Sequence, residues 1–243
     1  MHLKTVQASA FKSVFEVLKD IISDVNFVFD KNGIYMRTLD NAKVTFINLF
    51  MDARNFELYE CPEKITVGLN IANTFKLLKI IGTNDTLEIS VNDKMEIIID
   101  NAQKKSNTVF RMNLLDINEE EYTLDDLKFS ITTVLQSVNF QRIIRDMVNF
   151  SSYVNISRFG NKLKMQCSGD FVDQVTEIEC SDTIDYTIED EYSLKYINMF
   201  TKATSISSNV SIQQCEHGGP IAFKYFIANL GEIQFFLASK TDQ

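Results

Sequence analysis

The stretch VFEVLKDII at residues 14–22 matches the stretch FQRIIRDMV at residues 140–148 in residue type at seven of nine positions, all but the second and third, at a shift of 126 residues. In both stretches the apolar residues recur at i, i+3, i+4, i+7 and i+8. This spacing predicts a helix that lies with one face on a core. The match indicates that the chain is built from two similar halves.

Alternating runs of β-branched and aromatic residues follow each of these helices. In the first half, residues 26–29 and 34–36 flank DKNG (30–33), whose residues tolerate the backbone of a hairpin turn. In the second half, residues 153–156 and 162–165 flank a turn that we predict near Gly160 and Asn161. Longer strands are predicted at 44–51 and 172–180.

A second pair of helices repeats at a shift of 123 residues. The stretch FKLLK (75–79) precedes the strand run LEI (87–89), and YINMFTK (196–202) precedes VSI (210–212). Each half therefore contains a helix, strands, a helix and strands. This order predicts an α+β fold with helices on one face of antiparallel sheets.

The bulk composition describes a folded chain of 243 residues with a net charge of −9. No apolar run reaches about 18 residues, so we expect no membrane-spanning helix. The amino terminus lacks the pattern of a signal peptide. The cysteines are widely spaced and are expected to be reduced, and we expect no metal and no cofactor. These residues are Cys61, Cys167, Cys180 and Cys215.

Positive charge is concentrated on four helix-like segments, at residues 9–22, 71–81, 137–150 and 192–204. Together they hold eight basic and three acidic residues in 52 positions, so the other 191 residues sum to −14. A single helix with two basic residues is typical of a solvated helix face, but four such helices in an acidic chain indicate a basic surface. Sparse charges without interleaved aromatic residues favour phosphate contacts that do not read sequence. The basic residues are Lys12, Lys19, Lys76, Lys79, Arg142, Arg145, Lys195 and Lys202.

An acidic stretch, DINEEEYTLDD at residues 116–126, separates the two halves. Such a run is typical of a solvated linker. We therefore predict an N-terminal domain at 1–115, an interdomain connector at 116–128 and a C-terminal domain at 129–243.

Several segments resemble the proliferating cell nuclear antigen family of DNA sliding clamps, in order and over nearly the whole chain. These are VQAS (6–9), LDNAKV (39–44), FTKATSISS (200–208) and YFIANLG (225–231). The resemblance implies two topologically similar clamp domains per subunit, with antiparallel sheets outside and two helices per domain on the inner face. It also implies a head-to-tail homotrimeric ring with all eight basic residues on the helices that line the hole.

The resemblance further implies where this chain would meet its partners. Subunits would pair through edge strands near 107–112 and 172–180, with Phe110, Val175, Glu177 and Ile178 in the interface. Polymerases and other proteins would insert a short motif into a groove under the connector. The matching groove positions are Leu39, Val44, Phe46, Tyr122, Leu124, Phe129, Pro220, Ile221 and Phe236. The lysine that many clamps modify with ubiquitin aligns near Arg158, in the predicted turn.

The leading hypothesis is a processivity factor that encircles duplex DNA, is placed there by a clamp loader and tethers DNA polymerase and other enzymes of DNA replication and DNA repair. The expected location is the nucleus, or a cytoplasmic replication site if the chain is viral. Two alternatives stay open: a subunit of a heterotrimeric checkpoint clamp, and a clamp-fold interaction scaffold without DNA binding. No nucleotide-binding loop or HExxH motif supports an enzyme, and the acidic clusters 119–121 and 189–191 fall in predicted loops.

Overall fold

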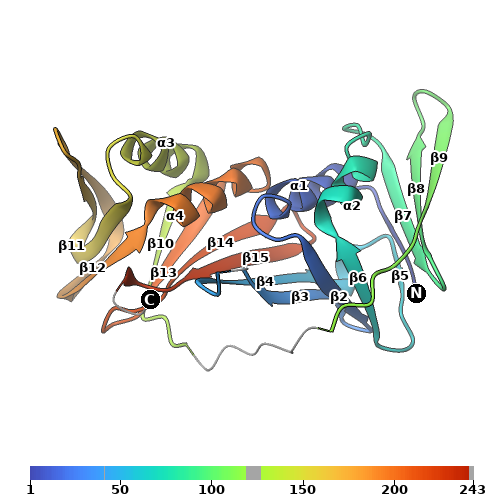
Figure 1. Ribbon diagram of the computed structural model, residues 1–243, viewed down its shortest axis with the longest axis horizontal. Helices are drawn as coiled ribbons and strands as arrows, with labels where there is room; N and C mark the ends of the chain where they lie inside the picture. Colours follow the sequence, from blue (N-terminus) through green and yellow to red (C-terminus); the bar gives the residue numbers. More distant parts are fainter. Residues whose placement is uncertain (41, 119–126, 241–243) are drawn as a thin grey trace. The chain divides into compact units, whose positions relative to one another are not determined.

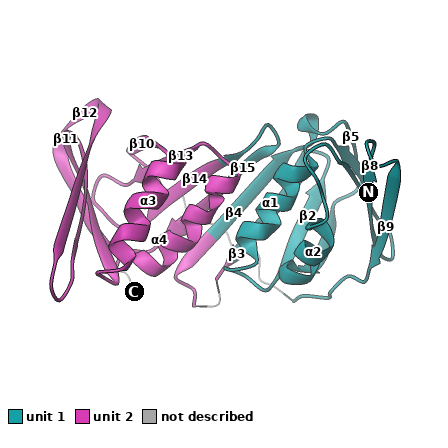
Figure 2. Ribbon diagram, turned by 90° about the horizontal axis from the view of Figure 1, so that it is seen from above, with its two compact units in different colours: residues 1–38, 47–123, 226–233 teal, residues 39–46, 124–225, 234–243 magenta. Residues whose placement is uncertain are grey.

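The computed structural model describes residues 1–40, 42–118 and 127–240. The chain divides into two compact units, coloured teal and magenta in Figure 2. The first comprises 1–38, 47–123 and 226–233, and the second comprises 39–46, 124–225 and 234–243. The predicted limits of the domains and of the connector stay predictions.

The first unit contains two α-helices, a short 3-10 helix and strands β1 to β9, with the end of β3 and the start of β4 assigned to the second unit. Their bounds are β1 (His2–Thr5), α1 (Ala8–Leu18), β2 (Asp24–Asp30), β3 (Gly33–Leu39), β4 (Thr45–Asp52), η1 (Ala53–Asn55), β5 (Leu58–Glu60), β6 (Ile65–Asn70), α2 (Ile71–Leu78), β7 (Thr86–Val91), β8 (Met95–Asn101) and β9 (Ser106–Met112). Strands β5, β1, β7, β8 and β9 form one antiparallel sheet in that order. In a second sheet, β2 lies between β3 and β6 and pairs with both in antiparallel fashion.

The second unit repeats this plan with fewer strands. Its elements are β10 (Ile131–Gln136), α3 (Ser137–Val148), β11 (Tyr153–Ser168), β12 (Asp173–Ser193), α4 (Leu194–Phe200), η2 (Thr201–Ser205), β13 (Asn209–Gln214), β14 (Ile221–Ile227) and β15 (Gly231–Leu237), with the end of β14 and the start of β15 assigned to the first unit. Strands β10, β13, β14 and β15 are neighbours in that order, and β11 pairs with β12 in a long two-stranded ribbon. Both units are α+β, as predicted.

The predicted helical stripes form the contact between the helices and the sheets. In each unit the two helices lie on the same face of a sheet (Figures 1 and 2). Phe15 on α1 stacks on Phe27 of β2 with 5.5 Å between ring centroids. In the second unit, Phe140 on α3 stacks on Phe223 of β14, also at 5.5 Å. Such ring pairs add about 1 kcal/mol each to the burial of their apolar surface.

The first predicted turn is confirmed, because β2 ends at Asp30, β3 begins at Gly33, and the two residues face each other in the hairpin. The Asp30 carboxylate accepts hydrogen bonds from the backbone N–H groups of Asn32 and Gly33, at 2.7 Å and 3.1 Å. An aspartate in this position closes a turn by capping the backbone that follows it.

The second predicted turn, near Gly160 and Asn161, is wrong. β11 runs without a break from Tyr153 to Ser168, and its register against β12 shifts on both sides of Gly160. Gly160 has a φ of +55°, which glycine adopts without strain, so it forms a bulge within a strand. Arg158 therefore lies in a strand and not in a turn, and its side chain is fully buried.

The strand predicted at 172–180 is much longer, because β12 continues to Ser193. The acidic cluster 189–191 therefore lies in this strand and not in a loop. The helix predicted at 192–204 begins only at Leu194, and it passes into the 3-10 helix η2 at Thr201. Tyr192 is held at the end of the strand, where it is buried and its hydroxyl donates to the carbonyl of Gly219 at 2.8 Å.

Candidate nucleic-acid interface

The predicted basic residues of the first unit divide into two kinds. The ammonium of Lys12, on α1, donates to the carbonyl of Ile81 at 2.8 Å, just beyond the end of α2. The ammonium of Lys19 lies over the ring of Phe75, on α2, 4.1 Å from its centroid. Both lysines are half-buried. They connect α1 to α2, so part of their charge serves the packing of the two helices.

The two lysines of α2 are more open to solvent. Lys76 is exposed and donates to the side-chain oxygen of Asn73 at 3.0 Å, one turn earlier. Lys79 caps the carboxyl end of α2 and is also exposed. A cation at this end of a helix opposes the partial negative charge of the last carbonyl groups. Both ammonium groups remain available to an external anion.

The four predicted basic residues of the second unit are all exposed. Arg142 and Arg145 lie three residues apart on α3 and therefore point from the same side of that helix. Lys195 lies in the first turn of α4, with its ammonium 5.5 Å from the ring centroid of Tyr196. Lys202 lies on η2. The structure thus places every predicted basic residue on, or directly after, a helix of its own unit.

The predicted motif groove is only partly built from exposed residues. Phe236 has its ring centroid 5.7 Å from that of Phe46 and 6.0 Å from that of Phe129. Phe46, Phe236 and Ile221 are buried, while Leu39, Val44, Phe129 and Pro220 are half-buried. These residues all belong to the second unit. Tyr122 and Leu124, which were predicted to complete the groove, lie outside the residues that the structure describes.

Asp40 organises the loop that carries Leu39 and Val44, and the sequence analysis missed it. Only 8% of this residue is exposed, and one carboxylate oxygen accepts hydrogen bonds from the backbone N–H groups of Val44 and Thr45, both at 2.8 Å. The backbone N–H of Ala238 donates to the carbonyl of Val44 at 3.2 Å, which holds the chain end against this loop. An aspartate followed by small and polar residues is a signal for such a loop.

The predicted interface residues lie on strands at sheet edges. Phe110 is half-buried on β9, the outer strand of the five-stranded sheet. On β12, Val175 is 50% exposed, Ile178 is half-buried, and Glu177 forms an ion pair of 2.6 Å with Lys162 of β11. This pair lowers the pKa of Glu177 and raises that of Lys162. Both strands offer backbone groups for pairing.

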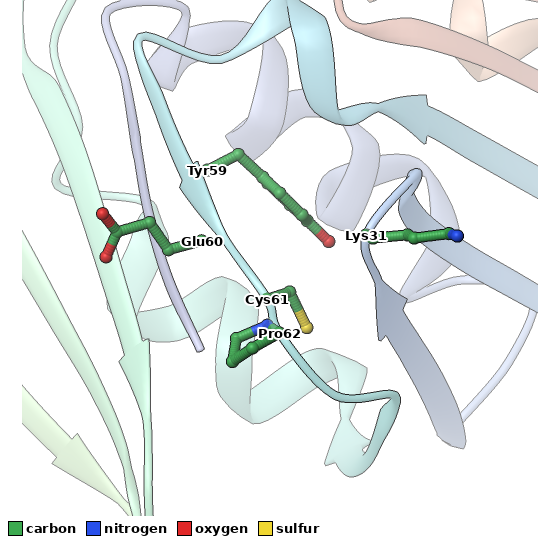
Figure 3. Close-up of a pocket in the computed structure, with 5 residues that line it drawn as sticks. All are labelled: Lys31, Tyr59, Glu60, Cys61 and Pro62. Carbon is green, nitrogen blue, oxygen red and sulfur yellow. The ribbon is translucent and has the colours of Figure 1, made fainter.

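One open pocket lies in the first unit, away from the predicted basic residues. It has a volume of about 490 Å³ and is lined by Lys31, Tyr59, Glu60, Cys61 and Pro62. Figure 3 shows the Tyr59 hydroxyl directed toward the segment of Lys31, while Glu60 points away. The Tyr59 hydroxyl donates to the carbonyl of Gly33 at 2.7 Å, and burial raises the pKa of both Tyr59 and Cys61. Burial thus favours the protonated form of both groups, which is the less nucleophilic form.

Among the described residues, no group of three or more His, Cys, Asp or Glu side chains is placed to hold a metal ion. No helix within the described ranges is long and apolar enough to cross a membrane. All four cysteines are free; Cys61 and Cys167 are buried, and Cys180 and Cys215 are half-buried.

Comparison with known proteins identifies the family. The family models described as "Proliferating cell nuclear antigen, N-terminal domain" and "C-terminal domain" match residues 1–122 and 123–240. A relative from Paramecium bursaria Chlorella virus 1, "Probable DNA polymerase sliding clamp 1", is 34% identical over 98% of this chain and 95% of its own length. "Proliferating cell nuclear antigen" of Dictyostelium discoideum is 30% identical over 98% of both chains.

The fold comparison agrees with the sequence comparison. One chain in the crystal structure of a PCNA2–PCNA3 complex from Sulfolobus tokodaii superposes with a TM-score of 0.88, covering 99% of both chains at 22% identity. At 22% identity this structural likeness supports the fold alone. The family models and the two relatives cover nearly the whole sequence, so they identify the family. The chain therefore belongs to the proliferating cell nuclear antigen family.

Proposed function

We propose that this chain is a DNA sliding clamp that closes into a ring of three copies around duplex DNA and tethers a polymerase. The observation that carries the proposal is the sorting of charge onto the helices. The whole chain has a net charge of −9, yet each unit places exposed basic side chains on its two-helix face. A ring built from such units presents a basic lining to DNA and an acidic exterior that repels it.

The helix-borne cations act as sparse point charges toward phosphate oxygens. Five of them are exposed and lie on or directly after an α-helix: Lys76, Lys79, Arg142, Arg145 and Lys195. Non-specific phosphate contacts of this kind are weak at physiological salt, so the ring can move along the duplex. Processivity then comes from topology, because a polymerase held by the ring stays at high local concentration after each release.

Partner proteins would bind the second unit around the aromatic cluster of Phe46, Phe129 and Phe236. The half-buried residues beside this cluster, Leu39, Val44 and Pro220, offer apolar surface to a short motif with aliphatic and aromatic anchors. The bonds of Asp40 preorganise the loop that carries two of these residues. The clamp itself performs no chemistry, and a clamp loader opens and closes it. We place it in the nucleus, or at a cytoplasmic replication site if its source is a virus.

A topological experiment tests the proposal. The full-length chain is loaded on a nicked circular plasmid with a eukaryotic-type clamp loader and ATP, and the plasmid is then cut once at a distant site. A ring slides off the new ends, so retention falls after cutting, while a protein held by direct contacts alone stays bound. The control chain carries Arg142→Ala and Arg145→Ala on α3.

The outcomes of this experiment distinguish the closed ring from binding by direct contacts alone and from the interaction scaffold. Loss after cutting, together with a solution mass of three chains, supports the closed ring. Equal retention on circular and linear DNA contradicts topological binding. Absence of any loading, with no salt-dependent DNA association, favours the interaction scaffold. We expect the control chain to close into rings of the same mass but to load less, since it lacks two phosphate contacts per copy.

A further inference from the structure

The turn between β13 and β14, residues 215–220, is bonded to the end of β12. It contains two adjacent glycines with left-handed backbones, Gly218 at a φ of +79° and Gly219 at a φ of +94°. The backbone N–H of Gly219 donates to the Asp190 carboxylate at 2.9 Å, and its carbonyl accepts from the Tyr192 hydroxyl at 2.8 Å. One residue of the turn is therefore held at both its donor and its acceptor by side chains of β12.

The two side chains that hold the turn are themselves fixed by their strand. In the β11–β12 ribbon, Asp190 lies opposite Ile156 and Tyr192 lies opposite Val154. Tyr192 is only 1% exposed. The second carboxylate oxygen of Asp190 accepts from the backbone N–H of Glu191 at 2.8 Å, which sets the direction of this carboxylate. The strand register thus determines where both side chains meet the turn.

The turn leads into the partner site, which is the surface around the aromatic cluster of the proposed function. Pro220 is the last residue of the turn and is half-buried. Directly after it, β14 begins and pairs with Gln214 of β13. The carbonyl of Gln214 accepts from the backbone N–H of Ser130 at 3.0 Å. The preceding residue, Phe129, has its ring centroid 6.0 Å from that of Phe236. The turn therefore borders the aromatic cluster within the second unit.

The same end of β12 holds a second segment beside the partner site. The ammonium of Lys240 forms an ion pair of 2.7 Å with Glu191 and lies 4.3 Å from the ring centroid of Tyr153. Two residues before Lys240, the backbone N–H of Ala238 donates to the carbonyl of Val44 at 3.2 Å. Two segments that are far apart in sequence and border the partner site thus meet the last residues of one strand.

The glycines explain why the turn needs these bonds. Glycine loses more backbone freedom on ordering than any other residue, so two adjacent glycines form a loose turn unless other groups hold them. A partner that bound beside a loose turn would have to order it, and this cost would reduce its affinity. The bonds from β12 order the turn in the free protein instead.

We propose that Asp190 and Tyr192 are positioning residues for partner binding, because they hold Gly219 and thereby fix Pro220 at the border of the partner site before a partner arrives. The inference rests on the partner site of the proposed function. It adds two residues that act through the turn and do not themselves serve as anchors for the partner's motif.

Two variants of the full chain test this role. Asp190→Ala and Tyr192→Phe each remove the bond on one side of Gly219. The matched control is Glu189→Ala, which removes the same charge one residue earlier, where the carboxylate accepts from the side-chain amide of Asn155 on β11. The probe is a fluorescein-labelled peptide whose isoleucine and phenylalanine side chains supply the aliphatic and aromatic anchors. A peptide of the same composition in scrambled order measures non-specific binding.

Fluorescence anisotropy measures the affinity for the peptide. We expect both variants to bind it about threefold to tenfold more weakly than the unmodified chain, since the freed glycines must be ordered again on binding. The control should bind like the unmodified chain. Amide hydrogen exchange at Gly219, followed by NMR, should be at least about tenfold faster in Asp190→Ala. Circular dichroism melts establish that every chain is folded at the temperature of the binding measurement, so a loss of stability alone does not change the affinity.

The results distinguish this inference from the function on which it rests. An unmodified chain that binds the anchor peptide no better than the scrambled peptide overturns the proposed partner site and this inference with it. Specific binding that is as tight in either folded variant as in the control overturns the inference and leaves the partner site intact. Equal exchange rates at Gly219 in the unmodified chain and in Asp190→Ala also overturn it. If one variant does not fold, the affinity of the other decides.

Discussion

Lys12 and Lys79 both count as basic helix residues in the sequence, yet the structure predicts opposite consequences for replacing them. The ammonium of Lys12 donates to the carbonyl of Ile81 at 2.8 Å, whereas Lys79 is exposed at the end of α2. We therefore consider Lys12→Met and Lys79→Met, which keep an unbranched apolar stem and remove only the charged group. The first change should affect stability, and the second should affect DNA binding.

The expected magnitudes follow from these surroundings. A hydrogen bond from a charged donor contributes about 1.5–3 kcal/mol when buried, and Lys12 is only half-buried, so we expect Lys12→Met to cost about 1 kcal/mol. Lys79→Met should change unfolding by less than about 0.5 kcal/mol, as exposed substitutions do. It should instead reduce the slope of log K against log salt by up to about 0.9 per chain, the value of one lost phosphate contact.

Urea unfolding and fluorescence anisotropy on a short duplex measure the two effects separately. Lys12→Met should lower the urea midpoint at an unchanged m-value and leave the salt slope close to that of the unmodified chain. The reasoning is refuted if Lys12→Met reduces the salt slope as much as Lys79→Met does and leaves the urea midpoint unchanged. In that case the contact with Ile81 would not hold the lysine away from DNA.

Three further predictions concern the scaffold. Arg158→Met should destabilise the chain by about 2–3 kcal/mol in urea unfolding, because the buried guanidinium donates to two backbone carbonyls and to half-exposed Asp182. A free energy of unfolding equal to that of the unmodified chain would contradict this prediction. Gly33→Ala should cost more than about 2 kcal/mol of stability, since the added Cβ would lie 2.0 Å from a backbone carbonyl oxygen of β4. Gly160→Ala meets no atom within 4 Å and should cost only about 1 kcal/mol, because alanine is strained at its positive φ. Thermal melts that rank the two variants the other way would refute the clash at Gly33. The guanidinium of Arg54 lowers the pKa of Asp52 to about 2. The contribution of this ion pair to stability is therefore present above the unfolded pKa of 3.8 and is lost as the pH falls through about 2. An NMR titration of Asp52 with a midpoint near 3.8 would show that the ion pair does not form in solution.

The periodicity of the apolar residues was sufficient to predict the repeated architecture. The stripes at 14–22 and 140–148 predicted α1 and α3, although α1 ends at Leu18 and its next residue, Lys19, caps it. The hairpin at Asp30–Gly33 was predictable because its turn residues act locally. The glycine at 160 was misread as a turn, because a positive φ serves a bulge within a strand equally well.

The candidate sites were predictable as residue types but not as environments. The sorting of charge placed the basic residues on predicted helices, and all eight lie on or directly after helices. It did not distinguish Lys12 and Lys19, whose partners Ile81 and Phe75 lie just beyond α2 and on α2. Asp40 was missed for a similar reason, because its role appears only when the loop folds back onto its carboxylate.

The sequence by itself determined the α+β class, the duplicated helix-and-strand plan and the sorting of charge, because these depend on patterns between residues close in the chain. Only the tertiary structure decided which cations stay open to phosphate, how far β11 and β12 extend, and where a buried guanidinium fixes a bulge. These features depend on residues far apart in sequence, such as Arg158 and Asp182, whose proximity is set by strand register.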